Sequence, residues 1–177
     1  TQSRQEILVW TDSSLYSLQY VGAPVVWSAQ LVGENISIAS QNAVAYANGV
    51  AYWMGVDKFY KYDGRTQTLR CDLRQFIFSS LNKDQYSQVL AGTNEAFNEI
   101  WWFYCVGDSN TITNYVVYNY AEDTWYYGTM GRTAWIDSGI SNNPISATYV
   151  QNLVEQEVGT DDAAGDTVQP IEAYIES

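Results

Sequence analysis

The stretch Glu99-Ile-Trp-Trp-Phe-Tyr-Cys-Val106 decides the fold class of this chain. At the two-residue period of a β-strand its side chains divide between two faces. Both sets are apolar: Ile100, Trp102 and Tyr104 on one face, and Trp101, Phe103 and Cys105 on the other. A strand that is apolar on both faces is covered on both faces. The stretch therefore predicts an inner strand packed between sheets, in preference to a binding platform for sugars or bases.

Short strands joined by tight turns recur along the rest of the chain. Asn48-Gly49 between two alternating apolar runs is the clearest hairpin signal, because both residues tolerate the positive φ of a type I′ turn. An aromatic strand followed by a tight polar link recurs at Tyr16, Tyr60 and Tyr118, at intervals of about 44 and about 58 residues, and the second interval is longer because it contains a predicted helix. Periods of about 40 to 50 residues with several strands each are typical of propeller blades.

We therefore predict an all-β fold, a single β-propeller-like domain over residues 1–177 built from blades of short antiparallel strands. Its expected blade-like units are about 4–38, 43–71, 89–137 and 145–177. Within the last unit, one strand is expected from Ala147 to Val158. The closing Ile171–Ser177 has the pattern of a strand that stops midway, so we expect the chain to be part of a longer one.

One short helix is expected at about 72–82, inside a helical insertion at about 72–85. Asp72 is suited to cap its first turn. Apolar residues then fall at the spacing of one helical face: Leu73, Phe76, Ile77 and Leu81.

Composition limits the possible functions. The chain has 177 residues, 46% of them apolar and 15% aromatic, so a folded domain with a substantial core is expected. Its net charge of -12 argues against tight binding of nucleic acid, because phosphate binding depends on cationic side chains. It contains no histidine, which removes Ser-His-Asp triads and histidine-ligated metal sites. We expect no enzyme activity, no catalytic residues, no cofactor and no membrane span.

The two cysteines, Cys71 and Cys105, are isolated in the sequence and form no C-x-x-C pair. Buried free thiols are the expected state, with a disulfide between them as the alternative.

A series of segments, in constant order from about Ala45 to the end, resembles a known family. The segments are Cys71–Asn82, Asn98–Tyr104, Tyr115–Tyr120 with Trp125, Arg132–Asp137, Glu157–Asp162 and Ile171–Ser177. Together they resemble structural tail proteins of tailed bacteriophages, in particular the propeller-like nozzle or packaged-DNA-stabilising protein of short-tailed phages. In that family a histidine often precedes the position of Glu157. This chain has Gln156 there, so no role of that histidine is carried over.

The resemblance implies a structural subunit of the virion tail, assembled in the host cytoplasm. It implies copies of the chain in a ring, a hexamer by analogy, joined to a portal or adaptor protein above and to tail-tip or fibre proteins below. Genomic DNA would pass without sequence-specific binding, and acidic residues facing the channel would repel its phosphates. The alternatives are a glycan-binding propeller module of a phage tail and a carbohydrate-active enzyme.

Candidate site residues follow from these hypotheses. Candidates for packing or for a subunit interface are Trp101, Trp102, Tyr118, Trp125, Arg132 and Trp135. No metal site is expected, and the weak calcium candidates are Asp161, Asp162 and Asp166, in an acidic loop that matches no EF-hand pattern. Carboxylates available for a glycosidase pair are Asp12, Asp57, Asp63, Glu99, Glu122 and Asp123. Tryptophans available to stack on sugars are Trp10, Trp27, Trp53, Trp125 and Trp135.

Overall fold

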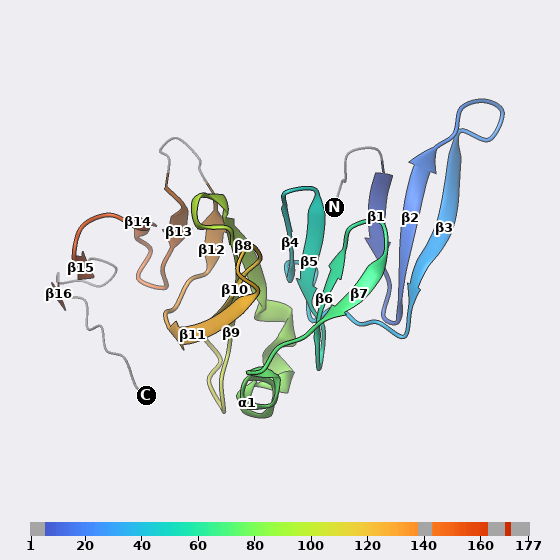
Figure 1. Ribbon diagram of the computed structural model, residues 1–177. Coiled ribbons are helices and arrows are strands. Elements are labelled where there is room, and N and C mark those ends of the chain that lie inside the picture. Colours follow the sequence, from blue (N-terminus) through green and yellow to red (C-terminus); the bar gives the residue numbers. More distant parts are fainter. Residues whose placement is uncertain (1–5, 138–142, 163–168, 171–177) are drawn as a thin grey trace.

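Antiparallel sheets, stacked in chain order, form most of the structure. The computed structural model describes residues 6–137, 143–162 and 169–170. In this part of the chain there are five sheets, and each strand pairs with the strand before or after it in the sequence. Figure 1 shows the first four sheets side by side, from β1–β3 on the right to β12–β14 on the left.

The first and second sheets come from the N-terminal part of the chain. The first sheet contains β1 (Glu6–Trp10), β2 (Ser14–Tyr20) and β3 (Trp27–Glu34). The second sheet contains β4 (Val44–Ala47), β5 (Val50–Met54), β6 (Phe59–Tyr62) and β7 (Thr66–Leu69). The hairpin of β4 and β5 turns at Asn48 (φ 48°) and Gly49 (φ 81°), as a type I′ turn requires. The hairpin predicted from Asn48-Gly49 is confirmed.

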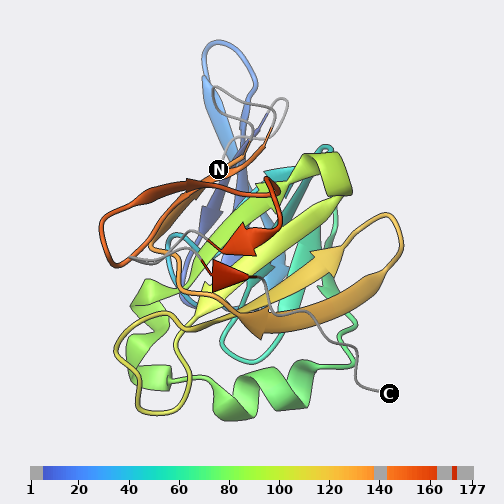
Figure 2. The ribbon, with the colours of Figure 1, turned by 90° about the vertical axis from the view of Figure 1, so that its left-hand side faces the viewer.

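The third sheet follows a helical connection and is built around the doubly apolar stretch Glu99–Val106. The connection contains α1 (Arg74–Ser80) and the 3₁₀ helix η1 (Lys83–Gln88). The strands of the third sheet are β8 (Leu90–Asn94), β9 (Glu99–Tyr104), β10 (Asn114–Asn119) and β11 (Thr124–Thr129), with the 3₁₀ helix η2 (Glu95–Phe97) between β8 and β9. Figure 2 shows α1 running beneath the stack. Its residue Ile77 is fully buried against the second and third sheets.

The fourth sheet and a small strand pair complete the described structure. The fourth sheet contains β12 (Ala134–Ile136), β13 (Ile145–Ala147) and β14 (Leu153–Glu155). The pair contains β15 (Asp161–Asp162) and β16 (Gln169–Pro170). β12 pairs with β13 and not with β11, so the boundary between the third and fourth sheets lies between Thr129 and Ala134. No helix in the described ranges has the length and apolar character needed to cross a bilayer.

Three apolar clusters separate the four stacked sheets. Leu15 and Trp53 lie in the cluster between the first and second sheets. Phe59 and Trp102 lie between the second and third sheets. Phe103 lies between the third and fourth sheets, in contact with Trp135. The second and third sheets are therefore covered on both faces, whereas each end sheet has one face in the stack.

The structure confirms the fold prediction at the level of class. The described residues are mostly β-strand in several antiparallel sheets, and none of these sheets closes into a barrel. One short α-helix lies inside the predicted range, but its N-cap is Leu73, without a side-chain hydrogen bond. The cap predicted for Asp72 is wrong, because its carboxylate instead accepts from Arg70 Nε at 3.2 Å.

The last predicted unit needs a second correction. Ala147 to Val158 is not one strand, because the chain turns back between β13 and β14. Thr148 N donates to Asn152 O at 3.0 Å across this turn, and Gln151 adopts a φ of 64°. The predicted strand over 171–177 lies outside the described residues.

Candidate functional site

The aromatic residues singled out from the sequence lie mainly between the sheets. On β9, Trp102 is buried against the second sheet and Trp101 is buried against the fourth. Trp102 stacks with Trp125 of β11 at a ring distance of 6.0 Å, and Trp101 stacks with Trp135 of β12 at 5.3 Å. Tyr118 of β10 is also buried, with its ring 4.7 Å from that of Trp125. These faces are filled by protein and offer no platform for a ligand.

Indole N–H groups fasten neighbouring sheets to one another. Trp102 Nε1 donates to Ala43 O at 3.0 Å, and Trp125 Nε1 donates to Arg70 O at 2.9 Å; both bonds tie the third sheet to the ends of the second. Trp135 Nε1 donates to Thr93 O at 2.8 Å and ties the fourth sheet to β8. Tryptophan suits this position because it combines a large apolar surface with one donor that needs a partner when buried.

Trp53 makes the same type of bond within the N-terminal half of the stack. Its Nε1 donates to Ser37 O at 3.0 Å, in the segment that joins the first and second sheets. Trp10 packs edge-on against Trp53, with ring centroids 5.5 Å apart. Of the tryptophans proposed for sugar stacking, Trp27 is the exposed one, while the other four are packed in the stack.

Arg132 is buried at the start of the fourth-sheet region. Its guanidinium donates to Gly131 O at 3.0 Å and to Gln156 Oε1 at 3.4 Å. Gln156 in turn donates through Nε2 to Ser146 Oγ at 2.9 Å. The side-chain amide of Gln156 therefore links Arg132 to β13. The proposed role of Arg132 as a subunit contact stays a prediction.

Glu99 is the most extensively bonded carboxylate of the glycosidase candidates. Its Oε2 accepts from Trp101 Nε1 at 2.9 Å and from Asn94 Nδ2 at 3.4 Å, and its Oε1 accepts from the Tyr126 hydroxyl. Burial, followed by the charge of Glu99, raises the pKa of the Glu157 carboxyl. Because donors from the protein occupy both oxygens of Glu99, its observed role is to hold β8, β9 and β11 together. No pattern in the sequence indicated this grouping, because it is the register of β9, β10 and β11 that places Tyr126 near Glu99.

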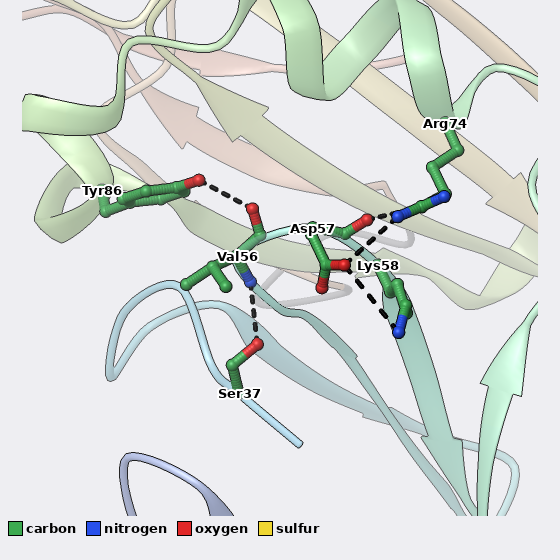
Figure 3. Close-up of polar contacts among 6 residues, drawn as sticks. All are labelled: Ser37, Val56, Asp57, Lys58, Arg74 and Tyr86. Carbon is green, nitrogen blue, oxygen red and sulfur yellow. Dashed lines mark hydrogen bonds and ion pairs between the residues drawn. The ribbon is translucent and has the colours of Figure 1, made fainter. Parts of the chain in front are cut away.

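Asp57 is the centre of a polar cluster that fastens the β5–β6 turn, as Figure 3 shows. Its Oδ2 lies 3.1 Å from Arg74 Nη2 of α1 and 3.8 Å from Lys58 Nζ. The adjacent Val56 accepts from the Tyr86 hydroxyl at 2.7 Å through its carbonyl. Its amide donates to Ser37 Oγ at 3.0 Å. The ion pairs are half exposed, so each contributes less than about 1 kcal/mol to the stability of the fold. The cluster connects the β5–β6 turn to α1, to η1 and to the segment between the first and second sheets.

The remaining carboxylate candidates are scattered. Asp123 accepts from the Tyr118 hydroxyl at 2.8 Å, and Asp63 accepts from Gln67 Nε2 at 3.4 Å. Asp12 and Glu122 are exposed turn residues. The described residues contain no group of three or more acidic or cysteine side chains placed to hold a metal ion.

The calcium candidates lie at the edge of the described chain. Asp161 is exposed in β15, and Asp162 belongs to the same strand. Asp166 lies outside the described residues. The thiols of Cys71 and Cys105 are free, as predicted, and burial raises the pKa of Cys71 to about 11.

A cavity of about 240 Å³ lies between β3 and the β6–β7 hairpin. Its lining is polar and includes Glu34, Lys58, Thr66 and Thr68. Pockets for small molecules usually have about 300 to 1,000 Å³ and a mostly apolar lining. The cavity therefore has neither the size nor the surface of a typical ligand site.

The most exposed aromatic pair is at the tip of the β2–β3 hairpin, which extends beyond the other sheets in Figures 1 and 2. Tyr20 and Trp27 meet edge to face there, with ring centroids 5.8 Å apart. From the sequence, Trp27 was predicted only as a residue available to stack on sugars, and this hairpin was not predicted to be an exposed surface. The available signal was the absence of any charged residue between Asp12 and Glu34.

Comparison with models of known protein families finds no match to this chain, and comparison with curated proteins also finds none.

Proposed function

We propose that this chain is a non-enzymatic structural subunit of a bacteriophage tail, a nozzle-type component that forms part of the DNA conduit. In this proposal the stacked sheets are blades of a propeller-like ring. Copies of the chain would join a portal or adaptor protein on one side and tail-tip or fibre proteins on the other.

The packing of β9 is the observation that best supports a structural role. Trp101 and Trp102 are buried on its opposite faces, and indole N–H groups bond to backbone carbonyls of adjacent sheets. These aromatic side chains are of the kind that forms binding platforms, but here they pack one sheet on the next. Such a stack is rigid, because close-packed interiors resist deformation. Rigidity suits a conduit that transmits load and keeps its diameter.

The charge of the chain supports passage of DNA without binding. A net charge of -12 would repel phosphates if acidic side chains face the channel. A high-resolution map of the assembled particle tests this point. Acidic residues on the channel wall would agree with the proposal, and a basic wall would contradict it.

Electron microscopy of the native full-length protein is the experiment that tests the assembly. We expect class averages with rotational symmetry, sixfold by analogy, and an open channel tens of ångströms wide. Compact single particles without a channel would contradict the proposal.

The exposed Tyr20 and Trp27 favour one second candidate, a glycan-binding module of a tail. Aromatic rings at an exposed hairpin tip can stack on sugar rings. A glycan array with the wild-type chain and the Trp27→Ala variant separates the two functions. Saturable binding that is lost in the variant would favour the glycan module, and no binding would leave the structural role.

A further inference from the structure

The outer face of the first sheet is apolar, and no other part of the described chain covers it. Cross-strand partners in the register of β1, β2 and β3 lie on the same side of the sheet. The side that points away from the second sheet carries Ile7, Val9, Tyr16, Leu18, Tyr20, Trp27, Ala29 and Leu31. We call this set the β1–β3 end face. None of its members is charged.

The side chains of this face are exposed to a degree unusual for their type. Tyr20 is 66% exposed and Trp27 is 50% exposed. By contrast, Trp53 and Trp102 in the inner sheets are fully buried. A contiguous exposed apolar patch on a folded protein commonly marks an interaction site.

The opposite end of the stack carries a second apolar face. Trp135, Ser146 and Val154 are cross-strand partners in the fourth sheet, and the Trp135 ring points toward the third sheet. The other side carries Ala134, Ile136, Ile145, Ala147, Leu153 and Glu155. We call this set the β12–β14 end face. Leu153 is 79% exposed and Ile136 is 58% exposed.

We infer that the two end faces bind each other between copies, so that the β1–β3 end face of one copy packs on the β12–β14 end face of the next. Face-to-face contact is how the stacked sheets already meet inside the chain. The chain has a net charge of -12, so copies repel one another over most surfaces. The end faces carry a single charged side chain, Glu155, whose Oε1 accepts from Asn143 Nδ2 at 3.3 Å.

The contact is head to tail because the two end faces differ in sequence and shape. A head-to-tail interface generates a ring if the rotation closes and an open fibre if it does not. This inference concerns the chain itself and holds whether or not the particle is a phage tail.

The interface is small, so its affinity should be moderate. Stable complexes bury about 800 Å² on each partner, and a three-stranded face with one hairpin tip provides less than that for each contact. We expect a dissociation constant in the micromolar range. The mass of the wild-type chain should therefore rise with concentration across that range.

Sedimentation velocity of single-face variants tests the inference. Val9→Lys places a charge on the β1–β3 end face, and Leu153→Lys places one on the β12–β14 end face. Each variant alone should associate at least about tenfold more weakly, because an unpaired charge would be buried at the contact. Gln67→Lys adds the same charge at an exposed position of β7, away from both faces, and should associate like the wild type.

Mixing the two variants gives the decisive result. Val9→Lys retains a working β12–β14 end face and Leu153→Lys retains a working β1–β3 end face, so the mixture should form one-to-one dimers and nothing larger. Circular dichroism and melting curves identify a variant that has failed to fold. For that case, Ile7→Lys and Ile136→Lys provide a second pair.

Three outcomes would overturn the inference. A wild-type chain that stays monomeric through the micromolar range would show that something other than a second copy covers the end face. Loss of association in Val9→Lys together with normal association in Leu153→Lys would mean that the first sheet packs against its own copy. Flotation of the monomer with neutral phosphatidylcholine vesicles would identify a lipid surface as the occupant.

Discussion

Replacing Trp102 tests whether indole groups hold the sheets together. This side chain is fully buried, donates to Ala43 O at 3.0 Å, and has its ring 5.0 Å from that of Phe59. Trp102→Ala removes the whole ring, and truncations of this kind cost about 3–5 kcal/mol. Trp102→Phe keeps most of the apolar contact but loses the hydrogen bond. That bond contributes about 1 kcal/mol, because Ala43 O keeps a second donor, Met54 N at 3.1 Å.

The smaller ring of phenylalanine also leaves unfilled volume, and this cost adds to that of the lost hydrogen bond. We therefore expect Trp102→Phe to lower the free energy of unfolding by about 2–3 kcal/mol. At about 2–4 °C per kcal/mol for a chain of this size, the melting temperature should fall by roughly 5–10 °C. Urea unfolding at low micromolar concentration gives the free energy, and calorimetry gives the temperature. Trp27→Phe, at the exposed hairpin tip, is the matched control and should stay within about 0.5 kcal/mol. Equal losses in the two Phe variants would refute the reasoning.

Three further predictions concern single positions. Gly92→Ala should destabilise the fold by about 1–3 kcal/mol, because a Cβ there would collide with the Trp135 ring. An unchanged free energy of unfolding in urea would contradict this, because it would mean that the Trp135 ring moves away from β8 at no cost. Asn48→Ala should cost about 1 kcal/mol, since alanine is strained at a φ of 48°, and a melting temperature equal to that of the wild type would contradict the turn assignment. Burial raises the pKa of Tyr52 and of Tyr104 from 10.0 to about 12. The folded state therefore holds these protons more tightly than the unfolded state, and stability should be intact below pH 10 and fall as the pH rises toward 12. Alkaline unfolding curves check this, and a stability that does not change over that interval would contradict it.

Local patterns predicted the features that depend on neighbouring residues alone. The apolar residues on both faces of Glu99–Val106 predicted that both faces of β9 are covered, and Asn48-Gly49 predicted a hairpin. Both signals are strong because side-chain direction in a strand and positive φ in a turn are set within a few residues. The free state of Cys71 and Cys105 was likewise predicted from their spacing.

Features that depend on competition between hydrogen-bond partners, or on the register between strands, were not predicted from the sequence. Asp72 looked like a helix cap, but the nearby Arg70 takes its carboxylate. The run from Ala147 to Val158 looked like one strand, because no glycine or proline marks its turn. The grouping of Glu99 with Tyr126 arises where β11 lies beside β10 and β10 beside β9, and the sequence alone does not fix such a pairing.

The pairing of each strand only with its neighbours in sequence bears on how the protein is made. Closing a short loop costs little conformational entropy, so each sheet can form as soon as its own strands are available. Within the described residues the four stacked sheets occur in chain order, from β1 to β14. During synthesis from the N-terminus, the first sheet can therefore fold while later sheets are still being translated, and each new sheet then has a finished surface on which to pack.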